Sequence, residues 1–151
     1  MRVPRALERL LRIRGLEEEQ RRIKLEASVA SLQKLEQARK AAAKMEREGR
    51  ARVAESAVSG DVADRVAGMV ETDTARARAR ILEPRIAAAE MESVERRREF
   101  LEKRVERRQA ATLIEEAAAR EELESERRSQ REIDDWFGTR IHRQADGEEQ
   151  G

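Results

Sequence analysis

Ser59-Gly60-Asp61 decides the fold, because it interrupts an otherwise almost continuous helical pattern. Apolar residues recur at helical spacing from about Ala6 to Ala57 before this break, and from about Arg85 to Ile141 after it. The two arms are nearly equal in length, so they can fold back on each other. At a 1.5 Å rise per residue, each arm would be a rod of roughly 80 Å. We therefore predict an all-α fold, a long antiparallel two-helix coiled-coil hairpin with the two termini together.

The composition fits a narrow seam between two helices better than a thick core. Of the 151 residues 43% are charged and only 2% are aromatic. A compact globule needs more large apolar side chains than this to offset the conformational entropy lost on folding. Disorder is the alternative at such a composition, but the apolar residues are regularly spaced, which favours a coiled coil. The net charge of +1 argues against a dedicated nucleic-acid binder, and the absence of cysteine excludes disulfides and thiol chemistry.

The break and the residues after it suggest how the chain is divided. Asp61 is expected to cap a short helix that begins at Val62. Thr72-Asp73-Thr74 and Pro84 are expected to interrupt the chain again, so that one or two short helices form the tip. We expect a single hairpin domain over 1–142, which comprises a first arm over about 5–57, a tip over about 58–84 and a second arm over about 85–142. A disordered tail over 143–151 is expected to follow it.

The expected seam is apolar at the start of the first arm, where Leu7, Leu10 and Leu11 open it. In the second arm an alternating spacing of three and four residues predicts a seam made of Met91, Val94, Leu101, Val105, Thr112, Ala119, Leu123, Ile133 and Phe137. Polar residues at the intervening positions predict a two-stranded, flexible rod. Residues 2–24 hold eight basic and four acidic residues, whereas residues 115–151 hold six basic and twelve acidic ones. These opposite charges would place Leu7–Leu11 beside Ile133–Ile141.

The sequence lacks the motifs of an enzyme. It has no Gly-rich phosphate loop, no Ser/His/Asp arrangement and no metal-ligand spacing, and its one histidine, His142, lies near the end of the second arm. We therefore expect a non-enzymatic protein with no catalytic residue, cofactor or metal. No apolar run reaches the length of a membrane span, so no direct membrane span is expected.

Two clusters have both a functional and a purely structural interpretation. The arginines between Arg96 and Arg108 would contact phosphate or an acidic protein, or else form a solvated helix face with the interleaved glutamates, and the spacing favours the second. Phe137 would continue the seam and close the open end of the hairpin against Leu7 or Leu10. Trp136 cannot share that face fully, which leaves it either in the seam or exposed as an anchor for a partner.

Two segments resemble one known family. Ala6–Arg14, followed by Glu17–Gln20 and Leu25–Leu35, is similar to the amino-terminal arm of the flagellar export protein FliJ family. Arg128–Trp136 is similar to the carboxy-terminal arm of that family. The length and the hairpin layout agree with it as well, so the resemblance extends over almost the entire chain.

The resemblance implies a stalk or adaptor of the bacterial flagellar type III protein export apparatus, which serves flagellum biogenesis and motility. Its partners would be the flagellar export ATPase ring, the membrane export gate protein and the export chaperones, with no nucleic acid. It would be cytoplasmic, peripheral on the cytoplasmic side of the cell membrane, and a monomer when free. The alternatives are a stalk of an injectisome type III secretion system, a generic coiled-coil scaffold protein, and a nucleic-acid-binding arm.

Two contact sites follow from the expected hairpin and the resemblance together. The end with both termini would contact the ATPase through Arg5, Arg9, Arg12, Asp134, Asp135, Trp136 and Arg140. The tip would contact the export gate through Met69, Val70, Ile81 and Leu82.

Overall fold

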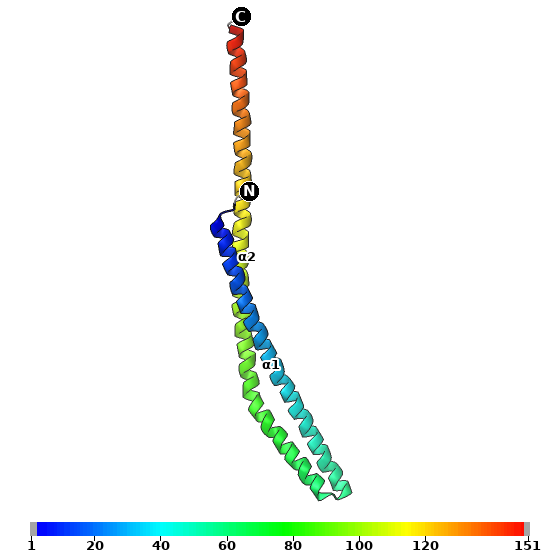
Figure 1. Ribbon diagram of the computed structural model, residues 1–151. Helices are drawn as coiled ribbons and strands as arrows, with labels where there is room; N and C mark the ends of the chain where they lie inside the picture. The colour runs from blue at the N-terminus through cyan, green and yellow to red at the C-terminus, as the bar shows by residue number, and fades with distance from the viewer. Residues whose placement is uncertain (1–2, 150–151) are drawn as a thin grey trace. The chain divides into compact units, whose positions relative to one another are not determined.

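Two long helices form the protein. The computed structural model describes residues 3–149 and consists of α1 (Arg5–Ser59) and α2 (Val62–Glu149) (Figure 1). The predicted all-α two-helix hairpin is confirmed. The chain divides into two units, which we call the turn unit (Glu17–Lys103) and the end unit (Met1–Leu16 with Arg104–Gly151). Each unit is described by itself.

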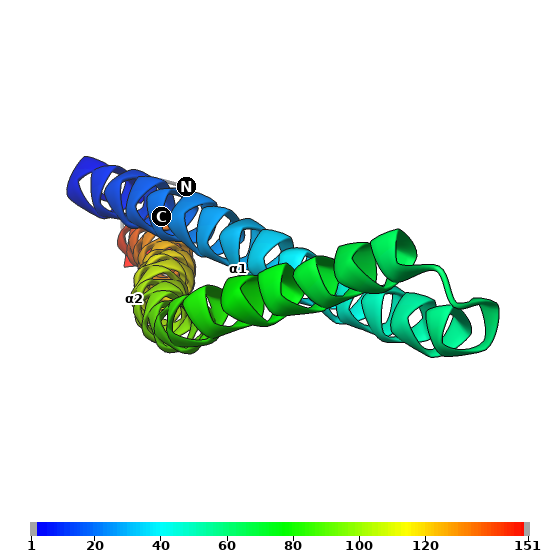
Figure 2. The same cartoon turned by 90° about the horizontal axis from the view of Figure 1, so that it is seen from below.

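The turn between the helices forms where the sequence predicts it. Gly60 adopts a left-handed φ of 74°, and its N–H donates to the Ser56 carbonyl at 2.8 Å, which ends α1. The side chain of Asp61 then accepts a hydrogen bond from the Asp64 N–H at 3.2 Å. Asp61 therefore caps α2, as predicted. Figure 2 shows this short connection at the right edge of the view.

The predicted short helices at the tip are wrong, because α2 runs without interruption from Val62 through the expected breaks. Thr72 does not cap a new helix: its hydroxyl donates to the Gly68 carbonyl at 2.8 Å, inside the same helix. Pro84 lies on the exposed side of α2. Water there can satisfy the carbonyl of Arg80, which loses its helical partner to the proline.

The boundaries of the predicted arms and tail change accordingly. The first arm extends two residues further than expected, to Ser59, and the second arm begins at Val62 instead of about residue 85. The predicted disordered tail is helical from Arg143 to Glu149. Gln150 and Gly151, which the same prediction includes, lie outside the described residues.

Paired side chains define an antiparallel register in the turn unit. Arg21 contacts Glu99 at 3.2 Å, the hydroxyls of Ser28 and Ser93 lie 2.9 Å apart, and Glu46 contacts Arg76 at 3.1 Å. The two residue numbers of each pair add to about 120, so the register stays constant along the unit. It therefore fixes which side of each helix faces the other.

The helices touch through their backbones at two glycines of the turn unit. A Cβ atom built on Gly49 would lie 2.9 Å from the Gly68 carbonyl oxygen, and one built on Gly68 would lie 2.7 Å from the Gly49 carbonyl oxygen. No real Cβ atom makes contacts this short, so only glycine fits at either position. Small buried residues continue the contact on both sides, among them Ala42, Ser56, Thr72 and Ala75.

The predicted seam of the second arm is wrong. Met91 and Val94 are 75% and 72% exposed, and Leu101, Val105, Leu123, Ile133 and Phe137 are exposed as well. The residues of α2 that face α1 lie two positions after those of the predicted seam. Ser93, for example, takes the place expected for Met91, and Arg96 the place expected for Val94. The prediction followed the bulkiest apolar repeat, whereas the observed repeat mixes small residues such as Ser93 and Ala110 with long charged and aromatic side chains that lie along the seam.

The end unit shows that the two helices do not end together. Leu7, Leu10 and Leu11 are half-buried, and Arg14 contacts Glu106 at 2.8 Å. From residue 122 to residue 149 every side chain of α2 is exposed, and the end of α2 continues without a neighbouring helix in Figure 1. Leu7–Leu11 therefore does not lie beside Ile133–Ile141, and the predicted meeting of the termini is wrong. The cause is length, since α1 has 55 residues and α2 has 88.

The glycine contact yields a stability prediction. Gly49→Ala should destabilise the hairpin by about 1–3 kcal/mol, because its Cβ would meet the backbone of α2. Gly15→Ala is the matched control: nothing lies within 4 Å of its Cβ, so the better helix propensity of alanine should stabilise the protein by about 1 kcal/mol. The free energy of unfolding of both variants is measured by urea unfolding, followed by circular dichroism. Equal stability of the two variants would contradict the close approach.

The register yields a distance prediction for the end unit. Spin labels at Arg9 and Thr112, both exposed, should lie near each other, across neighbouring helices whose axes are about 10 Å apart. Labels at Arg9 and Thr139 should be further apart by about 40 Å, the rise of the intervening part of α2. Electron paramagnetic resonance measures both distances and so distinguishes an α2 that extends past α1 from two helices that end together. A short Arg9–Thr139 distance would restore a hairpin whose helices end together.

Candidate interaction surfaces

The end of α2 is a single helix with no cover among the described residues. We call residues 122–149 the overhang; it corresponds to a length of about 40 Å. The positions that would continue the α2 seam are occupied by Glu124, Arg128, Arg131 and Asp135. These side chains are charged, so the overhang is not built to receive a longer α1. Its apolar residues lie on another face, where Ile133, Phe137 and Ile141 follow one another at intervals of four.

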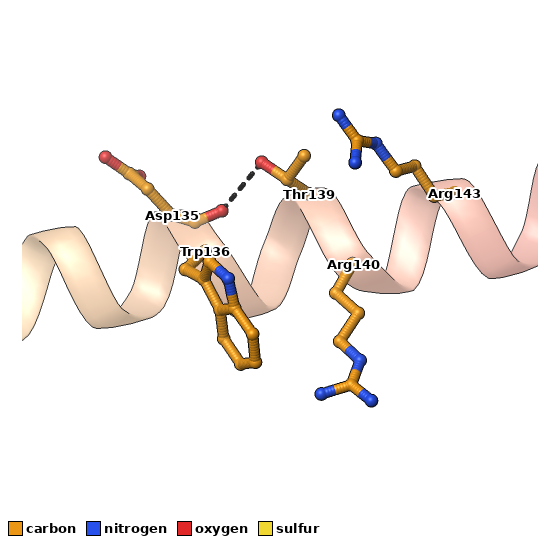
Figure 3. A pocket seen from close by; sticks show the side chains of 5 residues that line it. All are labelled: Asp135, Trp136, Thr139, Arg140 and Arg143. Carbon is orange, nitrogen blue, oxygen red and sulfur yellow. Dashed lines mark hydrogen bonds between the residues drawn. The ribbon is translucent and has the colours of Figure 1, made fainter.

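An aromatic pair marks this apolar face. The rings of Trp136 and Phe137 meet edge to face, with centroids 5.0 Å apart and an interplanar angle of 79°. The Arg140 guanidinium lies 5.2 Å from the centroid of the Trp136 ring, and Figure 3 shows both side chains extending from the same side of the helix. Trp136 and Phe137 are 56% and 52% exposed. Phe137 therefore does not close the hairpin against Leu7 or Leu10, and Trp136 is not in the seam.

The seven residues predicted to contact the ATPase fall into two groups. Asp134, Asp135, Trp136 and Arg140 share the overhang, where Asp135, Trp136 and Arg140 line one shallow hollow with Thr139 and Arg143 (Figure 3). Arg5, Arg9 and Arg12 are exposed at the start of α1. The register of the end unit places that start beside the part of α2 that precedes the overhang. The structure thus does not bring the three arginines together with Asp134 and Asp135.

The four residues predicted to contact the export gate lie in the turn unit. Met69, Val70 and Ile81 are exposed, and Leu82 is half-buried. They do not form one patch. Met69 lines a groove with Arg50, Val53, Thr72, Asp73 and Arg76. Ile81 and Leu82 line a separate groove with Ala38, Ala41, Ala42 and Arg78.

Sequence reasoning missed two features of the turn unit. Val58, Val62 and Val66 are exposed around the turn, Val58 by 92%. Their apolar character was visible, but only the register shows that α1 and α2 leave them uncovered. The alanines of the second groove were missed as well, because a run of alanine in a helix gives no sign of a concave surface.

The arginines between Arg96 and Arg108 include several that are engaged by glutamates along their own helix. Arg96 contacts Glu92 and Glu99, and Arg98 contacts Glu95 and Glu102. The hydrogen bond from Arg98 lowers the pKa of the Glu95 carboxyl below its ordinary value. This part of α2 therefore carries a ladder of ion pairs at i,i+3 and i,i+4 spacing, and not a purely cationic surface.

Within residues 3–149, no helix is long and apolar enough to cross a membrane. The same part of the chain holds no cluster of three or more histidine or acidic side chains that could bind a metal ion. Comparisons with the profiles of known protein families, with curated proteins and with solved structures gave no significant match.

The single tryptophan offers a direct test of the overhang. Because Trp136 is the only tryptophan of the chain and is half-exposed, its fluorescence should have the long-wavelength emission of a hydrated indole and be quenched readily by acrylamide. The spectrum should not change on dilution if the chain is a monomer when free. A short-wavelength emission that shifts on dilution would instead indicate that a second copy covers Trp136.

Proposed function

We propose that the protein is a non-enzymatic stalk and adaptor of the bacterial flagellar type III export apparatus, which couples the export ATPase ring to the membrane export gate and the export chaperones. The resemblance of Ala6–Arg14 and Arg128–Trp136 to the FliJ family supports this proposal. In this role the protein is a monomer when free and lies in the cytoplasm, peripheral to the membrane through the export apparatus. An injectisome stalk would have the same geometry.

The main support for the proposal is the overhang, in which α2 extends beyond α1 with all of its side chains exposed. A narrow charged helix with one aromatic anchor fits a stalk that engages the lumen of a ring. Charged contacts of modest strength suit such a stalk, because it has to release each contact with the ring before it forms the next. Trp136 and Phe137 add a point of stronger attachment, because large aromatic side chains dominate the energetics of interfaces. Arg5, Arg9 and Arg12 would form a second contact with the ATPase, at the start of α1.

The turn unit is assigned to the export gate in this proposal. Met69, Val70 and Ile81 are exposed apolar side chains of the turn unit. Each lies at or beside a groove of the turn unit, and an apolar side chain at a groove can anchor a partner. The gate would contact two sides of the hairpin, since Met69 lines one groove and Ile81 with Leu82 lines another.

A coiled-coil scaffold is the second candidate, and one observation favours it. Met91, Val94 and Leu101 form an exposed apolar stripe on the side of α2 that faces away from α1. Such a stripe would suit the seam of a further coiled-coil strand. Sedimentation distinguishes the two functions, because a scaffold self-associates as its concentration rises whereas a stalk stays a monomer.

Stimulation of the purified export ATPase tests the stalk. The double variant Trp136→Ala/Arg140→Glu should reduce stimulation about tenfold, a loss of about 1.4 kcal/mol of binding free energy. Reversing the charges of Arg5, Arg9 and Arg12 should reduce it as well. All three arginines lack an ion-pair partner among the described residues, so the hairpin should stay folded.

Lys40→Glu/Arg47→Glu is the matched control, since it reverses two exposed cations in the turn unit and should leave stimulation unchanged. Circular dichroism on the same preparations verifies the fold. Full stimulation by folded overhang and α1 variants would exclude both surfaces as the ATPase site.

A further inference from the structure

The middle of the turn unit carries an excess of cations. Residues 34–47 and 76–85 contain nine basic residues and three acidic ones. The basic residues are Lys34, Arg39, Lys40, Lys44, Arg47, Arg76, Arg78, Arg80 and Arg85, and the acidic ones are Glu36, Glu46 and Glu83. The nearly neutral chain therefore has a strongly positive segment in each arm, and the register places the two segments opposite each other.

Few of these cations are neutralised within the protein. Glu46 is shared between Arg50 and Arg76, at 2.7 and 3.1 Å. The Arg78 guanidinium rests on the Met45 sulfur at 3.6 Å and not on a carboxylate. Lys34 and Arg85 have no carboxylate partner among the described residues. These side chains are thus available to a negatively charged partner.

A groove lies between the two positive segments. It has a volume of about 330 Å³ and is lined by Ala38, Ala41, Ala42, Arg78, Ile81 and Leu82. The three alanines have no side chain beyond Cβ, so the surface of α1 is recessed beside them. Ile81, which is 56% exposed, rises beside them from α2. The lining is apolar except for Arg78.

Helical spacing puts cations on both sides of this groove. Lys34 precedes Ala38 and Ala41 by four and seven residues, so all three lie on one face of α1. Arg78 and Arg85 lie four residues before Leu82 and four residues after Ile81, and hence flank the apolar wall on α2. The groove therefore combines a small apolar hollow with a cationic rim on each helix.

We propose that this groove binds an acidic amphipathic segment of a partner protein, which inserts one large apolar side chain between Ala41 and Ile81. Its carboxylates would pair with Lys34, Arg78 and Arg85. The proposal deepens the proposed function, because Ile81 and Leu82 are among the residues assigned to the export gate, and it names the chemistry of the segment that would dock there. A nucleic acid would satisfy the cations but would leave the apolar hollow without a matching group.

A labelled peptide tests the groove on the full-length protein. The probe is a fluorescein-labelled helical peptide in which glutamates surround one central phenylalanine, and its binding is followed by fluorescence anisotropy. Arg78→Glu/Arg85→Glu should weaken binding at least about tenfold, and binding to the unaltered protein should weaken as salt is added. Ala41→Trp should weaken binding similarly by filling the hollow. Ala41 is exposed, so the larger side chain should not disturb the seam.

Arg47→Glu/Arg80→Glu is the matched charge control, because it changes the net charge equally with residues that do not line the groove and that helical spacing places on the far side of each helix. It should weaken binding less than about twofold. Equal weakening by both charge reversals would overturn the proposal in favour of general attraction. So would unchanged binding of a peptide with glycine in place of phenylalanine, tighter binding of an oligonucleotide of equal charge, or a dimer in sedimentation that Arg78→Glu/Arg85→Glu abolishes.

The gate protein itself separates this inference from the proposed function. If Ala41→Trp abolishes peptide binding but leaves capture of the purified export gate protein intact, the groove stands and its assignment to the gate fails. If the peptide does not bind the unaltered protein at all, the groove proposal fails, whatever the gate does.

Discussion

The close contact between Gly49 and Gly68 is the constraint on which the turn unit depends. Each glycine would place a Cβ atom less than 3 Å from the backbone of the opposite helix. Two helices this close cannot shift along each other without bringing a larger residue into the contact. The glycines therefore hold the register, and the register in turn decides which apolar side chains are covered. Met69, Val70 and Ile81 face outward for that reason, although their hydrophobicity alone would have suited a seam.

The sequence was sufficient for the fold and insufficient for the register. Gly60 ends one helix and Asp61 caps the next. Each role follows from the residue type itself, so both could be predicted from the sequence. The seam of α2 could follow either of two repeats, the one through Met91 and Val94 or the one through Ser93 and Arg96. Summed hydrophobicity favours the first, whereas the packing against α1 uses the second. Trp136 shows the same division. Its role as a candidate anchor could be proposed from its rarity, but its exposure depends on the length by which α2 exceeds α1.

Charged side chains occupy seam positions in both units, and their effect differs from that of the glycines. In the turn unit Arg21 contacts Glu99 and Lys103 contacts Glu17, while in the end unit Arg14 contacts Glu106. These pairs are partly exposed, so each contributes little to stability. A register shifted by one or two residues would separate the partners, but a shift of seven residues would place Arg14 opposite Glu99 and Arg21 opposite Glu92. Such pairs therefore favour the register within one repeat, whereas the glycine contact disfavours a shift by a whole repeat.

Small residues have two consequences at once in this hairpin. Ala42 is buried in the seam, where it lets the helices approach, and it also lines the groove beside Ile81. A larger residue there would fill the hollow and separate the helices at the same time. Ala41, one position away, is exposed and lines only the groove. The packing role of the alanine run and its proposed binding role can thus be separated by substitution: a change at position 42 is expected to alter stability and binding together, and a change at position 41 to alter binding alone.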